Sequence, residues 1–220
     1  MQTKPLNSLK TLLELLEKPI GPKPTFEVVD MLKLIFLLGE DTPIGRKKIA
    51  RILQLGEGSV RTMLNRLQER SLIKVERSGC KLTDTGKLIH RSLLKMLTPP
   101  KPIDAGPLSQ GKWNYVVLIR DSASKVKSGL EQRDAAVRAG ADGATTIVYL
   151  GKRFLLPDTR IDLEKSYLIP LWDSLKSLLE PRDGDSIIIV GGNSVKAAEE
   201  GALAAALYTI LQSNHFRQKT

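Results

Sequence analysis

This chain is poor in the residues that build disulfides, metal sites and common catalytic centres. Cys80 is its only cysteine, so no internal disulfide can form, and we expect it to be a small buried residue. His90 and His215 are the only histidines, and no Ser-His-Asp or His-Glu-x-x-His pattern surrounds them. The sequence therefore predicts no catalytic residue, no metal ion and no cofactor.

Long apolar runs are also missing. A bilayer-spanning helix needs about 20 consecutive apolar residues, and no stretch here approaches that length. The first 18 residues are amphipathic and contain Glu14 and Glu17, unlike the apolar centre of a signal peptide. We expect no membrane association and a cytoplasmic location.

The chain is rich in positive charge, with a net charge of +10 over 220 residues. Residues 1–100 hold 18 Lys and Arg against 10 Asp and Glu, whereas residues 101–220 hold 16 against 14. The first half thus carries +8 of the total, which favours a polyanionic partner such as nucleic acid.

Composition divides the chain near its middle. Residues 98–111 contain four prolines and two glycines, which cannot extend a helix or fill a central strand. We expect a linker there. The predicted organisation is an amphipathic helix with a proline-rich connection in residues 1–24, one domain in 25–97, the linker in 98–111 and a second domain in 112–214.

The first half reads as helices followed by a hairpin and a closing helix. Leucines at positions 9, 12, 13 and 16 form the stripe of an amphipathic helix. Thr25 is expected to cap a second helix, and a third begins near Gly45. A fourth helix follows Gly56 and Gly58, with Ser59 as its expected cap. Residues 72–76 and 80–82 are predicted to form a hairpin around residues 77–79.

Gly56 and Gly58 allow three interpretations. A dinucleotide-binding loop needs a third glycine where this chain has Arg61, and it should follow a strand rather than a helix. A turn between two helices, with Gly56 at positive φ, explains the glycines alone. A winged helix-turn-helix explains the glycines, the polar outer face of the next helix and the basic hairpin together, and this is the interpretation we favour.

In a winged helix-turn-helix the second helix of the pair lies in the major groove, and the hairpin contacts the backbone or the minor groove. Arginine suits guanine edges and asparagine suits adenine edges. The residues predicted to contact DNA are Arg46, Lys47, Lys48, Ser59, Arg61, Thr62, Asn65, Arg66, Lys74, Arg77 and Lys81.

Three stretches resemble a known family. Residues 44–67 read IGRKKIARILQLGEGSVRTMLNRL, residues 130–137 read LEQRDAAV and residues 151–157 read GKRFLLP. They resemble an archaeal family whose members join a winged helix-turn-helix to a carboxy-terminal domain of unknown function. The resemblance covers the chain from about residue 25 onward. It implies a transcription regulator, but it supplies no ligand, target site or catalytic residue.

The second half is predicted to be an α+β sandwich with a mixed four-stranded sheet. Alternating and continuous apolar runs indicate strands, and longer periodic segments indicate helices. The expected strands are 113–119, 144–150, 153–156 and 186–190, and the expected helices are 125–139, 170–179 and 194–211.

Two features of the second half are candidate ligand sites. Gly191, Gly192, Asn193 and Ser194 connect a strand to a helix, whose first N–H groups can bind an anion. Arg133 could hold a carboxylate or phosphate. The alternatives are a glycine turn into a capped helix and surface ion pairing.

The sequence thus predicts a sequence-specific DNA-binding transcriptional regulator. We expect double-stranded DNA as its partner, a homodimer that reads two half-sites, and a carboxy-terminal domain that senses a small-molecule or protein effector. Two other classes stay open: an enzyme that acts on a phosphorylated small molecule, with the winged helix as a tether, and a non-catalytic RNA- or protein-binding adaptor.

Overall fold

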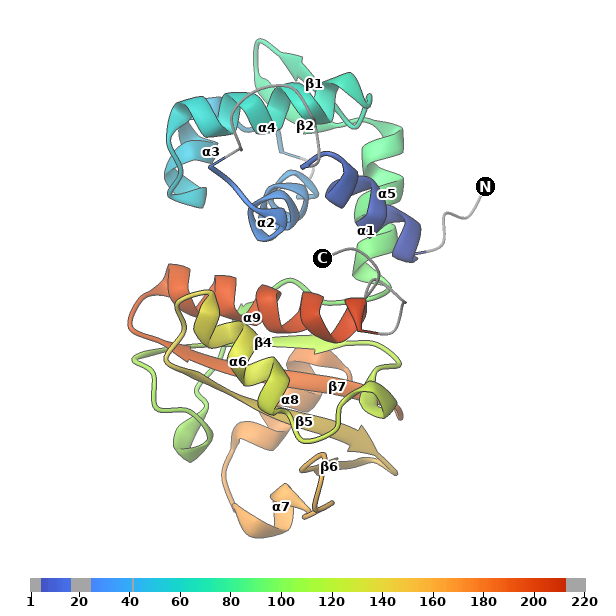
Figure 1. Ribbon diagram of the computed structural model, residues 1–220, viewed down its shortest axis with the longest axis vertical. Coiled ribbons are helices and arrows are strands. Elements are labelled where there is room, and N and C mark those ends of the chain that lie inside the picture. Colours follow the sequence, from blue (N-terminus) through green and yellow to red (C-terminus); the bar gives the residue numbers. More distant parts are fainter. Residues whose placement is uncertain (1–4, 17–24, 41, 213–220) are drawn as a thin grey trace. The chain divides into compact units, whose positions relative to one another are not determined.

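The computed structural model describes residues 5–16, 25–40 and 42–212. The chain divides into two compact units, Met1–Lys95 and Met96–Thr220 (Figure 1). Residues 98–111, expected as a linker, belong to the second unit, where part of this stretch forms a short strand.

The first unit is helical with one two-stranded hairpin. Its buried core comes from apolar faces of all its helices, and α2 alone buries eight of its eleven residues. The elements are α1 (Pro5–Glu14), α2 (Val28–Leu38), α3 (Arg46–Leu53), α4 (Glu57–Glu69), β1 (Ile73–Glu76), β2 (Gly79–Leu82) and α5 (Asp84–Leu94).

The turn between α3 and α4 differs in detail from the prediction. Gln54, with φ of 52°, is the left-handed residue that ends α3, whereas Gly56 has extended backbone with φ of −62° and caps α4. Ser59 is therefore the third residue of α4 and not its cap, and its hydroxyl lies 2.6 Å from the hydroxyl of Thr25. Thr25 in turn does not cap α2, whose cap is Glu27.

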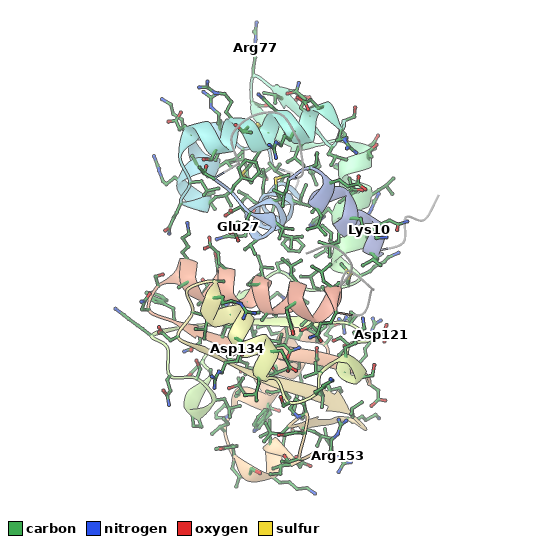
Figure 2. All side chains as sticks on the ribbon, viewed as in Figure 1. Lys10, Glu27, Arg77, Asp121, Asp134 and Arg153 are labelled. Atoms are coloured by element: carbon green, nitrogen blue, oxygen red, sulfur yellow. The ribbon has the colours of Figure 1, made fainter. Side chains whose placement is uncertain are left out.

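β1 and β2 form a hairpin at the position that the sequence predicts. β1 and β2 pair antiparallel with Ile73 opposite Leu82 and Glu76 opposite Gly79, which leaves residues 77–78 as a two-residue loop. Arg77 projects from this loop away from the rest of the unit (Figure 2). Ile44 pairs with Cys80 on the other side of β2.

A five-stranded sheet organises the second unit, in the order β3-β4-β7-β5-β6 with every pair antiparallel. The predicted mixed four-stranded sheet is therefore wrong. The fifth strand consists of Lys101 and Pro102. It lies at the sheet edge, which suits proline because proline has no backbone N–H to donate to a second neighbouring strand. The strands are β3 (Lys101–Pro102), β4 (Trp113–Ile119), β5 (Gly143–Leu150), β6 (Arg153–Leu155) and β7 (Asp185–Gly192).

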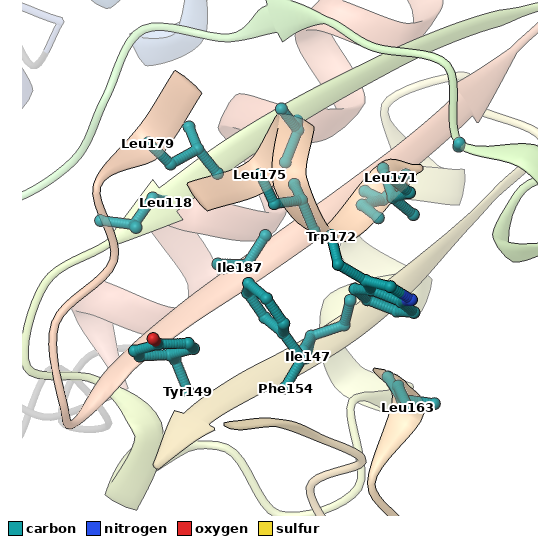
Figure 3. Packing of buried hydrophobic residues seen from close by; sticks show 13 residues of the cluster. Leu118, Ile147, Tyr149, Phe154, Leu163, Leu171, Trp172, Leu175, Leu179 and Ile187 are labelled. Carbon is teal, nitrogen blue, oxygen red and sulfur yellow. The ribbon is translucent and has the colours of Figure 1, made fainter. Parts of the chain in front are cut away.

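Helices cover both faces of this sheet (Figure 1). α6 (Leu130–Arg138) and α9 (Val195–Leu211) pack against each other and against one face, and α8 (Leu171–Leu179) covers the other. Beneath α8, Phe154 stacks on Trp172 with ring centroids 5.3 Å apart (Figure 3). Since strand side chains alternate, Ile187 and Ile189 of the central strand both join this cluster.

Candidate nucleic-acid interface

A groove of about 830 Å³ runs over the surface of the first unit. Its walls come from the beginning of α3, the outer face of α4 and the hairpin, three elements that the fold brings together from separate parts of the sequence. The lining residues are Gly45, Arg46, Lys47, Lys48, Arg61, Leu64, Asn65, Gln68, Val75, Glu76, Arg77, Gly79 and Cys80.

Positive charge dominates this groove. Five lining residues are Lys or Arg, all five are exposed, and Glu76 is the one acidic residue of the lining. Three of the cations, Arg46, Lys47 and Lys48, occupy the first turn of α3, where the helix dipole disfavours positive charge. A nearby anion would offset that cost, so the groove suits a polyanionic ligand.

Glu76 reduces the positive charge of the hairpin locally. Its carboxylate lies 2.7 Å from Lys81 Nζ and 3.1 Å from Lys74 Nζ. Hydrogen bonds from Lys81 and then Lys74 lower the pKa of Glu76 below its ordinary value. Neither lysine lines the groove, so these two predicted DNA contacts lie beside it. Both help to line a second hollow around Thr83.

The outer face of α4 presents a row of polar side chains. Arg61, Asn65 and Gln68 stand four and three residues apart, which places them on one side of the helix, and all three line the groove. Gln68 was missed by the sequence prediction, although its spacing from Arg61 would have indicated it. Ser59 and Thr62 lie outside the lining, and the Thr62 hydroxyl donates to the Gly58 carbonyl at 3.1 Å.

Arg66, predicted to contact DNA, is not part of this exposed row, and its burial argues against that contact. The residue is only 8% exposed. Its Nη1 donates to the carbonyl oxygens of Leu15, at 2.6 Å, and Leu16, at 3.4 Å, and its guanidinium lies 5.3 Å from the Phe26 ring centre. The last carbonyl groups of a helix lack hydrogen-bond donors within the helix, and Arg66 supplies donors at the end of α1.

The hairpin places one cation and one apolar side chain at the open side of the groove. Arg77 stands at the loop, and Val75, on the strand before it, is 53% exposed. Cys80 is a buried member of the lining, and its burial raises the pKa of its thiol, while the charge of Arg46 opposes that rise.

The glycine pair predicted to form an anion site lies inside the sheet. Gly191 and Gly192 belong to β7, opposite Asn114 and Trp113, and both are buried. A Cβ on Gly191 would lie 2.7 Å from the backbone N of Gly111, so the glycine permits close chain packing. Asn193 and Ser194 are exposed, and the Ser194 hydroxyl caps α9 by accepting from Ala197 N at 3.1 Å. Arg133 lines a different groove, which residues 191–194 do not border.

Within the described residues, no cluster of three or more His, Cys, Asp or Glu side chains could hold a metal ion. None of the helices in the same part of the chain is long and apolar enough to cross a membrane.

Comparison with known proteins gives matches over both units. Residues 25–88 match the family model described as "PH0730-like, N-terminal domain", and residues 110–210 match "Domain of unknown function (DUF4443)". The solved structure of "Hypothetical protein PH0730 from Pyrococcus horikoshii OT3" is similar, with 30% sequence identity and a TM-score of 0.69. That match covers 86% of this chain and 95% of the other. No curated protein matches the chain.

Proposed function

This chain belongs to the family of the Pyrococcus horikoshii protein PH0730, and we propose that it is a sequence-specific DNA-binding transcription regulator. The name of that relative records no activity, so the proposal stands on this chain's own residues. The observation that carries it is the groove of the first unit, where four exposed cations flank the row formed by Arg61, Asn65 and Gln68, and Arg61 is the fifth.

The dimensions of α4 support a major-groove role. The helix has 13 residues and is therefore about 20 Å long. The major groove of B-form DNA is about 12 Å wide and admits one helix. Arg61 would pair with a guanine edge, while Asn65 and Gln68 offer the amide groups that match adenine. In this arrangement the first unit is a winged helix-turn-helix, with α4 as its reading helix.

The remaining cations serve the phosphates. Residues 46–48 stand at one wall of the groove, where they would contact one backbone strand, and Arg77 on the hairpin would contact the backbone or the minor groove on the other side. Such contacts fix the position of the protein without reading sequence. Because one reading helix covers only a few base pairs, the proposal includes a homodimer on two half-sites.

A binding experiment tests the proposal. The full chain is first used to select duplexes from a random pool, and affinities for a selected duplex are then measured by fluorescence anisotropy over a range of salt concentrations. We expect Arg46→Ala, Lys48→Ala and Arg61→Ala each to weaken binding, and each lost phosphate contact to reduce the salt slope by about 0.9. Loss of Arg61 should also relax the preference at one base pair.

Arg51→Ala is the matched control. Arg51 is exposed and lies on α3 like Arg46, so its removal changes the net charge by the same amount as each groove variant. It does not line the groove, so its removal should not weaken DNA binding in the same way. If the three groove variants bind DNA like Arg51→Ala, the proposal is wrong. Binding to duplex RNA or to a protein in place of DNA would instead support the adaptor hypothesis.

A further inference from the structure

The second unit contains a groove of its own, with a volume of about 900 Å³. It lies among residues 107–111, Arg133 and Val137 of α6, the beginning of β5 and the segment from Leu156 to Tyr167. Ligand pockets for small molecules typically have volumes of about 300–1,000 Å³, so this groove has the size of a binding site.

The groove collects exposed apolar side chains. Val137 is 46% exposed, Ile161 48% and Tyr167 40%, and all three line it. Val137 lies on the groove side of α6. Apolar side chains that remain accessible and converge on one hollow mark a surface suited to an apolar group.

The charged part of the lining is balanced. Arg133 and Asp142 are its only ionisable Lys, Arg, Asp or Glu residues, and both are exposed. Arg133 stands one helical turn before Val137, so its guanidinium borders the same apolar surface. Asp134, its ion-pair neighbour at 3.7 Å, is not in the lining, and both members of that pair are more than half exposed. A pair this exposed is weak and leaves Arg133 able to bind an anion.

Hydrogen bonds hold the walls in place. The Thr145 hydroxyl donates to the Leu108 carbonyl at 2.7 Å, which fixes the loop to β5. On the opposite wall, Leu156 N donates to Ile161 O at 3.0 Å, and the indole N–H of Trp172 donates to Tyr167 O at 2.7 Å. The groove is therefore formed before any ligand enters, which lowers the entropic cost of binding.

We propose that this groove binds a zwitterionic small molecule with an apolar body, namely an apolar α-amino acid or a dipeptide of such residues. The ligand carboxylate pairs with Arg133, whose planar guanidinium suits it, and the ligand ammonium pairs with Asp142. Its apolar side chain covers Val137, Ile161 and Tyr167. A zwitterion matches the zero net charge of the lining, whereas a phosphorylated ligand would place excess negative charge beside Asp142.

This inference is independent of the DNA proposal. The two grooves share no residue and lie in different units. Failure of one binding experiment therefore leaves the other proposal intact.

The test is titration of the full chain, labelled with nitrogen-15, followed by nuclear magnetic resonance. L-phenylalanine and L-phenylalanyl-L-leucine are the probes. We expect saturable changes in chemical shift with at least one of the two probes, confined to amides in residues 107–111, 130–145 and 156–167. The probe that binds with higher affinity shows whether the ligand is an amino acid or a dipeptide. N-acetyl-L-phenylalanine lacks the ammonium and L-phenylalaninamide lacks the carboxylate, so each should bind about tenfold more weakly than L-phenylalanine. Glycine, which has no apolar body, should not bind.

Two variants assign the charges. Arg133→Gln should weaken the binding of L-phenylalanine but leave that of L-phenylalaninamide unchanged. Asp142→Asn should weaken the binding of L-phenylalanine but leave that of N-acetyl-L-phenylalanine unchanged. Arg138→Gln is the control, because Arg138 is exposed on the same helix but outside the lining. The proposal is overturned by the absence of saturable shifts for both probes up to about 10 mM, or by equal binding of the charged and neutralised probes.

Discussion

Arg66 and Leu15 are 51 positions apart in the sequence, yet Arg66 Nη1 donates a hydrogen bond of 2.6 Å to the Leu15 carbonyl oxygen in a buried site. This bond joins α4 to the end of α1. The amino-terminal helix is thereby an integral part of the unit that carries the basic groove, and Arg66 positions α4 from behind while Arg61 stands on its open face.

Substitution of Arg66 should therefore reduce stability. In Arg66→Met the aliphatic stem is kept, but the carbonyls at the end of α1 lose their charged donor. We expect a loss of about 2–3 kcal/mol in the free energy of unfolding, the cost of a buried hydrogen bond to a charged group. Chemical denaturation followed by circular dichroism measures it.

Arg61→Met is the matched control for Arg66. It removes the same charge from the same helix at an exposed position, and we expect a change within about 0.5 kcal/mol. Equal stability losses in the two variants would show that the contact with α1 has no energetic importance.

A second prediction concerns the glycines at the end of β7. A Cβ on Gly192 would lie 2.8 Å from the backbone N of Ala198, an atom that cannot move without distorting α9. Gly192→Ala should cost about 1–3 kcal/mol through overpacking. Gly143→Ala serves as the comparison, because a Cβ on Gly143, in the neighbouring strand, meets nothing within 4 Å. A Gly192 variant as stable as the Gly143 variant would contradict the packing role, as thermal unfolding will show.

Local sequence patterns predicted the elements whose causes are local. The apolar run from Trp113 to Ile119 gave β4 with its observed bounds, and the cap at Ser194 placed the beginning of α9. The basic row at the beginning of α3 and the position of the hairpin could be predicted for the same reason, since each depends on neighbouring residues.

Features that depend on distant residues could not be predicted. Arg66 has the helical position of a surface residue, and only the folded position of Leu15 explains its burial. Lys101 and Pro102 resemble a linker until Val116 and Tyr115 provide a strand to pair with. Gly56 appeared the natural residue for positive φ, but the chain adopts it at Gln54, where α3 ends. Each error comes from a tertiary contact or a turn geometry that outweighs local preference.

A third prediction concerns pH. The His90 ring packs edge-on against Phe36, with centroids 6.2 Å apart, and burial, followed by the charge of Arg91, lowers the pKa of His90 below its ordinary value near 6.5. At pH values between the folded and unfolded pKa, the unfolded chain binds more protons. Stability from this group is therefore present above about pH 6.5 and is lost as pH falls toward the folded pKa.

We expect the midpoint temperature of thermal unfolding to decrease when the pH is lowered from about 7.5 to about 5.5, and to decrease less in His90→Gln than in the wild type. His215→Gln, which removes the other histidine of the chain, is the control and should retain the wild-type dependence. An unchanged pH dependence in His90→Gln would assign the effect to other groups.

The last prediction concerns Glu76, which opposes the positive charge of the hairpin by accepting hydrogen bonds from Lys74 and Lys81. If the groove binds DNA, Glu76→Gln should strengthen DNA binding for two reasons. Both lysines become available to phosphates, and a carboxylate that the phosphates repel is removed. The affinity should rise most at low salt, and the slope of log affinity against log salt should become steeper by about 0.9 for each lysine that gains a phosphate contact. Glu40→Gln changes the net charge equally at an exposed residue outside the groove and should have little effect. If Glu76→Gln weakens DNA binding, the ion pairs instead hold the hairpin in its binding geometry, and the carboxylate supports the interface rather than opposing it.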